Sequence, residues 1–84
     1  MASNPGDAVK LQWAARIGSA VSGKRIVEVR YMTQKEVDAL GWSRAAVVFV
    51  LNDGHLVWPS SDDEGNDAGA MFSTYENLET FPVI

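Results

Sequence analysis

The side chains most able to do chemistry are concentrated in one acidic segment, residues 60–69. Its oxygen-bearing side chains include Asp62, Asp63, Glu64, Asn66 and Asp67. Carboxylate and amide oxygens at this density, with two glycines to bend the chain, could wrap a hard cation such as Ca²⁺ or Mg²⁺. Their order departs from the calcium-loop pattern, in which acidic residues alternate before a glycine and a glutamate follows. A divalent-cation or small-ligand site is therefore one of three interpretations of this segment.

Two other interpretations of the same segment stay open. Asp, Asn and Gly each favour turns for local reasons, so residues 60–69 can form a solvated loop without a ligand. Alternatively, Asp62 or Asp63 caps a short helix that runs toward Phe72, and the rest of the loop forms a recognition surface. The sequence alone does not decide among the three.

We expect the protein not to be an enzyme, because the residues that catalysis needs do not gather in a motif. His55 is the one histidine of the chain, and we expect it to face solvent beside a tight turn. Ser60 and Ser61 are the nearest serines, but no nucleophile motif surrounds them. Neither common phosphate-binding glycine loop occurs in the sequence. Because the chain has no cysteine and one histidine, it cannot build a thiolate or multi-histidine zinc site by itself, and we expect no cofactor.

The aromatic residues point instead to binding between proteins. Three tryptophans are many for a chain of 84 residues, and one small core cannot easily bury all of them. Tryptophans left partly exposed are common anchors of protein interfaces. We expect Trp13 to be a packing anchor, and a partner to be bound by Trp42, Trp58, Asp62, Asp63 and Glu64. The predicted function is a non-enzymatic interaction or accessory protein that self-associates or docks on a protein partner; the alternative is a cation or small-ligand module.

The charge of the chain is divided between its two halves. Residues 1–44 hold all seven lysines and arginines and four acids, a net charge of +3, whereas residues 45–84 hold seven acids and no base. The two halves can neutralise each other in the folded domain, or an acidic face can meet a basic partner or the basic face of another copy. A direct nucleic-acid ligand is disfavoured, because phosphates require a concentrated basic patch.

Composition also predicts where the protein works. The longest apolar run, Ala45 to Leu51, has seven residues, whereas a membrane-spanning helix needs about 20. Residues 1–7 lack the basic start and apolar stretch of a secretory signal. A small secreted domain would usually carry disulfides, so the absence of cysteine favours the cytoplasm. We expect no contact with a membrane.

Two helices and a strand are predicted in the first half of the chain. A helix begins at residues 4–7, with Asn4 as its N-cap, and ends near residues 22–23. Residues 24–32 read as a strand that buries Val27, Val29 and Tyr31 on one face. Residues 33–36 form a capping box for a short helix that ends at residue 41, where the chain has a glycine.

A hairpin is the strongest signal in the second half. Residues 45–51 and 55–59 read as strands joined at Asp53-Gly54, a typical two-residue type I′ turn. That turn predicts the cross-strand pairs Asn52 with His55, Leu51 with Leu56, Val50 with Val57 and Phe49 with Trp58. Residues 78–84 read as a last extended segment, because apolar and polar residues alternate there.

These elements predict a single α+β domain over residues 1–84, with residues 1–6 disordered. The N-terminal helix and the short inserted helix accompany an antiparallel sheet of three or four strands, curled enough to resemble a partly closed barrel. A domain of this size has a stability of only a few kcal/mol unless it forms oligomers.

The segment from Gly23 to Phe72 resembles a group of small uncharacterised bacterial proteins. The residues that carry the resemblance are Gly23-Lys24-Arg25-Ile26, Arg30-Tyr31-Met32-Thr33, Leu51-Asn52-Asp53-Gly54, Pro59-Ser60, Asp63-Glu64-Gly65-Asn66 and Gly69-Ala70-Met71-Phe72. The N-terminal helix lies outside it. The resemblance implies no particular activity, cofactor or catalytic residue.

Overall fold

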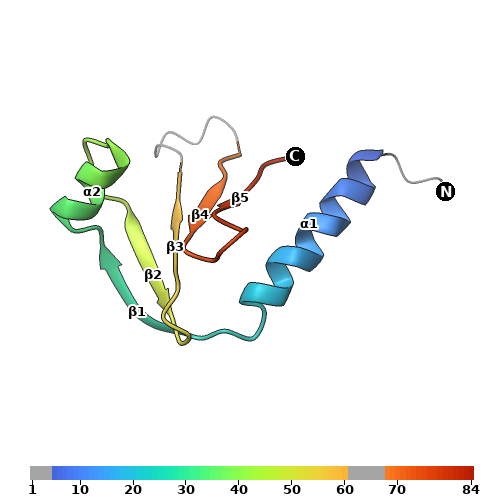
Figure 1. The fold of residues 1–84 in the computed structure, drawn as a ribbon, viewed down its shortest axis with the longest axis horizontal. Helices are drawn as coiled ribbons and strands as arrows, with labels where there is room; N and C mark the ends of the chain where they lie inside the picture. The colour runs from blue at the N-terminus through green and yellow to red at the C-terminus, as the bar shows by residue number, and fades with distance from the viewer. Residues whose placement is uncertain (1–4, 61–67) are drawn as a thin grey trace.

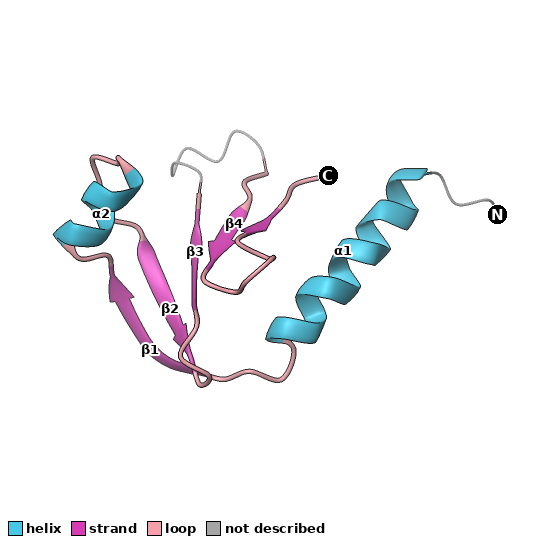
Figure 2. Cartoon of the chain, in the orientation of Figure 1, coloured by secondary structure: helices cyan, strands magenta, loops and turns pink. Residues whose placement is uncertain are grey.

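The computed structural model describes residues 5–60 and 68–84, which form two helices and one sheet (Figures 1 and 2). The elements in chain order are α1 Pro5–Val21, β1 Ile26–Tyr31, α2 Gln34–Leu40, β2 Val47–Leu51, β3 Leu56–Pro59, β4 Met71–Ser73 and β5 Thr80–Phe81. Neighbouring strands are antiparallel and lie in the order β1-β2-β3-β4-β5, so the sheet is open. The α+β class, the N-terminal helix and the inserted helix are confirmed.

The sheet has five strands, one more than the upper end of the predicted range. The strand that the sequence pattern did not predict is β4, with three residues, whereas β5, with two, lies within the predicted extended segment 78–84. Strands this short carry too few alternating residues to show a period of two. They form because Phe72 pairs with Trp58 on one side and with Thr80 on the other.

The N-terminal end of the chain is the part that was predicted to be disordered. Residues 5 and 6, which lie in the range predicted to be disordered, belong to the first turn of α1. Residues 1–4, including the predicted N-cap Asn4, lie outside the described residues. Within the described ranges, neither α1 nor α2 is long and apolar enough to cross a membrane.

The caps of α2 follow the prediction in detail. The Thr33 hydroxyl oxygen accepts a hydrogen bond from the Glu36 N–H at 3.2 Å, and the Glu36 carboxylate accepts one from the Thr33 N–H at 2.8 Å. Gly41 has a φ of 72° and ends the helix in the left-handed conformation, with its N–H donating to the Asp38 carbonyl. These local bonds give α2 defined ends although it has only seven residues.

The hairpin forms where it was predicted, but its register is shifted by one residue. Val50 pairs with Leu56 and Phe49 with Val57, and the Leu51 N–H donates to the His55 carbonyl at 2.9 Å. The loop therefore has three residues, and Gly54 takes its left-handed position with a φ of 87°. A three-residue hairpin loop needs a glycine in that position as much as a two-residue loop does, so the Asp-Gly pair does not separate the two.

The register shift places the apolar side chains in two small cores, one on each face of the sheet. The α2 core is formed by Met32, Val37 and Val48, with Trp42, Ala46, Leu56 and Trp58 packed against it. The α1 core is formed by Leu51, Val57 and Tyr75, with Ala20, Val21, Phe49, Leu78 and Phe81 packed against it. The predicted pair of Phe49 and Trp58 is wrong, because these two residues belong to opposite faces.

Helix α1 contributes only its last turn to the α1 core, through Ala20 and Val21. One turn earlier, the Arg16 guanidinium donates to the Asn77 carbonyl at 3.1 Å. In Figure 1 the rest of the helix extends past the β5 side of the sheet, far from β1. Val9 and Leu11 on this outer part are 39% and 71% exposed.

The burial predicted for β1 is wrong. Val27, Val29 and Tyr31 were expected on a buried face, but they are 53%, 59% and 70% exposed. The reason is the position of β1 at the edge of the sheet, with α1 at the opposite side (Figure 1). An alternating pattern predicts a face that can be buried, but it does not specify an element that covers it.

Candidate interaction surface

The structure brings the predicted partner-binding residues Trp42 and Trp58 together around Phe72. The ring centroids of Trp42 and Phe72 lie 6.3 Å apart, and those of Trp58 and Phe72 lie 6.2 Å apart in an edge-on arrangement. Both tryptophans are half-buried against the α2 core. Trp13 is also half-buried, and the Arg16 guanidinium lies over its ring, with the guanidinium carbon 4.4 Å from the Trp13 ring centroid. The role of Trp42 and Trp58 in binding stays a prediction.

The acidic candidates lie outside the described residues. This applies to the proposed cation ligands and to the acids expected to bind a partner, which are Asp62, Asp63, Glu64, Asn66 and Asp67. Among residues 5–60 and 68–84, no three His, Cys, Asp or Glu side chains are grouped as a metal site requires.

A small apolar hollow lies between α2 and the sheet. It has a volume of about 200 Å³ and is lined chiefly by apolar side chains, among them Met32, Leu40, Val48, Leu56 and Trp58. Pockets for small molecules usually measure about 300–1,000 Å³ and combine apolar walls with several placed polar groups. The hollow falls below that range, so it does not favour a small-molecule site.

His55 lies in a hydrogen-bonded cluster rather than at the solvent-facing position predicted for it. It is half-buried, and its ring stacks on Tyr75 with 4.1 Å between centroids. Its Nδ1 lies 2.9 Å from the Thr74 hydroxyl, which also accepts a hydrogen bond from the Leu56 N–H. The Tyr75 hydroxyl donates to Asp53 Oδ2 at 2.7 Å.

The electrostatics of this cluster indicate a structural role. Burial, with the hydrogen bond to the Asp53 carboxylate as a second cause, raises the pKa of Tyr75 to about 12. The same hydrogen bond is the main cause that lowers the pKa of Asp53. A phenol that stays protonated and a carboxylate that stays ionised form a stable donor and acceptor pair at neutral pH. The pair fastens the segment after β4 to the hairpin turn.

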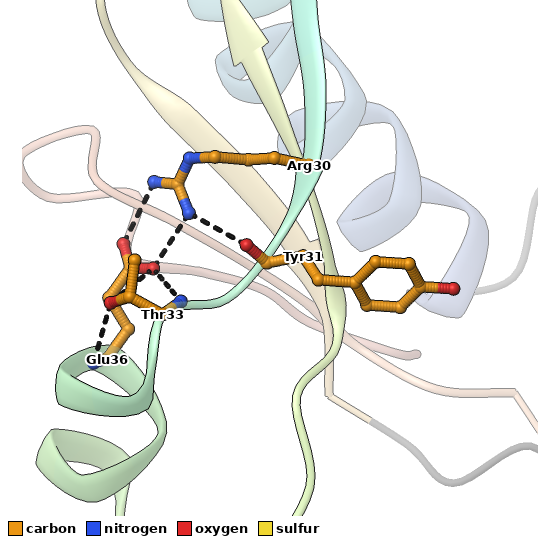
Figure 3. Close-up of polar contacts among 4 residues, drawn as sticks. All are labelled: Arg30, Tyr31, Thr33 and Glu36. Carbon is orange, nitrogen blue, oxygen red and sulfur yellow. Dashed lines mark hydrogen bonds and ion pairs between the residues drawn. The ribbon is translucent and has the colours of Figure 1, made fainter.

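A second network joins β1 to α2 (Figure 3). The Arg30 guanidinium donates to both carboxylate oxygens of Glu36, at 2.8 and 3.0 Å, and also to the Tyr31 carbonyl at 3.1 Å. The hydrogen bond from Arg30 is the largest cause that lowers the pKa of Glu36 to about 2, followed by that from the Thr33 N–H. In Figure 3 the Tyr31 ring points away from this network.

The Glu36 network makes a testable prediction about acid stability. A carboxyl whose pKa falls from 4.5 to about 2 on folding contributes stability that is complete above about pH 4.5 and lost as the pH falls toward 2. Glu36→Gln keeps an acceptor for the cap but removes the charge. We expect it to lower the free energy of unfolding by about 1 kcal/mol at pH 7, and the difference from wild type to vanish near pH 2. Urea titrations across this pH range measure it.

Glu76→Gln is the matched control, because it removes an exposed carboxylate that is not part of the Glu36 network. We expect it to change the free energy of unfolding at pH 7 by less than about 0.5 kcal/mol. A constant difference between wild type and Glu36→Gln from pH 7 to pH 2 would contradict the assigned role of the ion pair.

The most exposed apolar surface on the sheet is on β1, where Ile26 is 52% exposed and the side chains Val27, Val29 and Tyr31, called here the β1 stripe, are more exposed still. Val29 lies opposite Phe49 and Tyr31 opposite Val47, so these two side chains are on the same face as the α1 core, whereas Val27 lies in a β-bulge between Ile26 and Glu28. Glu28 and Arg30 lie opposite Val50 and Val48 on the face with α2. Sequence reasoning identified these residues as one face but assigned them to the interior.

Comparison with known proteins adds nothing to this geometry. No protein family, curated protein or solved structure matches the chain. The resemblance to small bacterial proteins therefore stays a prediction.

Proposed function

We propose that this chain is a non-enzymatic interaction domain that self-associates, and that the β1 stripe is the surface it uses. The observation that carries the proposal is the exposure of three apolar side chains in alternation on an edge strand, at 53%, 59% and 70%. Edge strands present unpaired backbone groups that can pair with another chain. Side chains that are both apolar and exposed stabilise such a pairing by leaving water.

The rest of the proposed role follows from composition. A chain without cysteine fits a reducing compartment, so we assign the domain to the cytoplasm. The excess of acidic over basic residues, with a net charge of −4, supports a protein partner over nucleic acid. The small core predicts low stability for one copy, which association would raise.

Self-association is tested by measuring the mass in solution as a function of concentration, with Val29→Lys as the critical variant. We expect the wild type to exceed the mass of one chain, 9.1 kDa, as its concentration rises. Lysine on an edge strand opposes pairing, so we expect Val29→Lys to weaken association at least about tenfold, a change of about 1.4 kcal/mol. Sedimentation equilibrium measures both.

Leu11→Lys is the matched control, because it places the same charge at a 71% exposed apolar residue on α1. We expect it to associate like the wild type, and we expect both variants to keep the wild-type circular dichroism spectrum. A wild-type protein that stays monomeric at millimolar concentration would contradict the proposed self-association. Loss of association in Leu11→Lys but not in Val29→Lys would move the surface to α1.

A further inference from the structure

We propose that two copies of this chain join their β1 strands in antiparallel fashion around a two-fold axis at Val29, which makes one continuous sheet across the dimer. The inference rests on the proposed self-association and adds the partner, the edge and the register. In this register Val29 faces Val29 of the second copy, Val27 faces Tyr31, and Glu28 faces Arg30. Three independent features of β1 support it: its backbone direction, its apolar side chains and its charges.

The backbone of β1 presents the correct groups at the open edge. The Met32 N–H donates to the Ala46 carbonyl at 3.0 Å, in the same register that pairs Arg30 with Val48. Because antiparallel strands alternate between residues that face the partner and residues that face away, Val29 and Tyr31 direct their N–H and C=O groups away from β2. Among the described residues, β1 has no strand on that side. Its edge is regular from Glu28 to Tyr31, after the bulge between Ile26 and Glu28, and this part can accept a second strand.

The apolar side chains of β1 match themselves under a two-fold rotation. A two-fold rotation around Val29 places Val27 of each copy opposite Tyr31 of the other copy. Pairs of aromatic and β-branched residues are among the favourable cross-strand pairs, each contributing about 0.2–1 kcal/mol. Three of the four apolar side chains that β1 leaves in water, those with 53%, 59% and 70% exposure, thus lie in one row across the dimer.

The charges of β1 are also complementary to themselves. Glu28 and Arg30 are the two charged residues of the strand, and they lie on the α2 face on either side of Val29. The rotation brings Glu28 of each copy opposite Arg30 of the other. Arg30 already holds Glu36 with two hydrogen bonds, so its guanidinium is oriented before the second copy arrives. Opposite charges directly across two strands stabilise the pair.

Charge also excludes the neighbouring registers. The backbone permits shifts of the second copy by two residues, because these keep outward groups facing each other. One such shift pairs Val27 with Val29 and brings Glu28 opposite Glu28. The other pairs Val29 with Tyr31 and brings Arg30 opposite Arg30. Like charges directly opposite each other destabilise strand pairing, so the register centred on Val29 is preferred.

Single cysteines on β1 test the register, since the natural chain contains none. Antiparallel residues that face each other have Cα atoms about 5.5 Å apart, which a disulfide can span. We expect Val29→Cys to form a disulfide-linked dimer under mild oxidation, in more than half of the molecules. Val27→Cys is the matched control, because it is similarly exposed on the same strand but would lie opposite Tyr31. We expect it to cross-link at least tenfold more slowly.

Mixing two variants gives the complementary result. Val27→Cys and Tyr31→Cys, combined in equal amounts, are expected to form the mixed disulfide in preference to either homodimer. A mixture of Val27→Cys and Val29→Cys would form the mixed disulfide in preference only if the register were the shifted one that pairs Val27 with Val29. Non-reducing electrophoresis and intact-mass measurement distinguish the products. Cross-linking of Val27→Cys to itself as fast as Val29→Cys would overturn the register.

Charge variants separate this inference from the proposed function. We expect Glu28→Lys to weaken dimerisation about tenfold, because lysine would face Arg30 of the second copy, whereas Glu76→Lys should leave it unchanged. If the wild type self-associates but neither Val29→Cys cross-linking nor Glu28→Lys behaves as expected, the two-fold pairing is wrong and the proposed function stands. If the wild type does not self-associate at all, both are wrong.

Discussion

Replacing Val48 with aspartate is expected to leave the chain unfolded at 25 °C. Val48 is 1% exposed and belongs to the α2 core with Met32 and Val37. An unpaired carboxylate in such a site costs several kcal/mol. A domain of this size rarely holds more than about 3–5 kcal/mol in total. Circular dichroism and the dispersion of amide proton signals in a one-dimensional NMR spectrum measure the loss of structure.

Two variants make the Val48 result specific. Val29→Asp introduces the same charge on the adjacent strand, where the valine is 59% exposed, and at low protein concentration it should stay folded. Val48→Ala removes only apolar volume, and we expect a loss of about 1–3 kcal/mol, or about 4–8 °C in Tm for each kcal/mol. A folded Val48→Asp variant with a normal melting temperature would contradict the assignment of Val48 to the core.

Replacing Tyr75 with alanine is expected to produce the second large effect, a loss of about 3–5 kcal/mol. Tyr75 is 8% exposed and joins the α1 core to the hairpin turn. Alanine would remove the ring that stacks on His55 and the hydroxyl that donates to Asp53. Since the loss approaches the total stability of the domain, we expect most molecules to be unfolded at 37 °C. Thermal and urea denaturation measure the change.

Tyr75→Phe separates the ring from the hydroxyl. The phenylalanine ring can keep the stacking on His55 and the packing of the core, so only the hydrogen bond to Asp53 is lost. Because Asp53 is exposed and also interacts with the His55 N–H and with Lys24, we expect a loss of only about 1 kcal/mol. Equal destabilisation by the two substitutions would show that the hydroxyl, and not the ring, holds the segment.

The parts of the fold that the sequence predicts are those controlled by local chemistry. The capping box at Thr33 and Glu36 and the left-handed Gly41 involve residues within one helix, so their types are sufficient to place the ends of α2. The same applies to the position of the hairpin, because Asp53 and Gly54 favour a turn wherever the chain is extended on both sides. The fold class and the order of the helices and strands along the chain follow from these local signals.

The parts that the sequence does not predict depend on distant contacts. The loop of the hairpin has a contact outside the hairpin, because Asn52 Oδ1 accepts from the Arg25 N–H, in addition to the local bond in which Asp53 Oδ1 accepts from the His55 N–H. The exposure of Val29 depends on the edge position of β1, which no residue of the strand reveals. The candidate surface was therefore missed, although its alternation of apolar and charged residues was recognised.

The attachment of α1 through Arg16, Ala20 and Val21, all in its C-terminal part, has a consequence for motion. The part of α1 before Arg16, residues 5–15, has 11 residues, and isolated helices shorter than about 12–15 residues are only marginally stable in water. Its turns before Arg16 therefore depend on their own hydrogen bonds, while the strands share a common cooperative unit. Local unfolding of α1 should begin at the N-terminal end of the helix and stop where Ala20 and Val21 contact the α1 core. The chain thus combines a rigid body with an arm whose order is graded along its length.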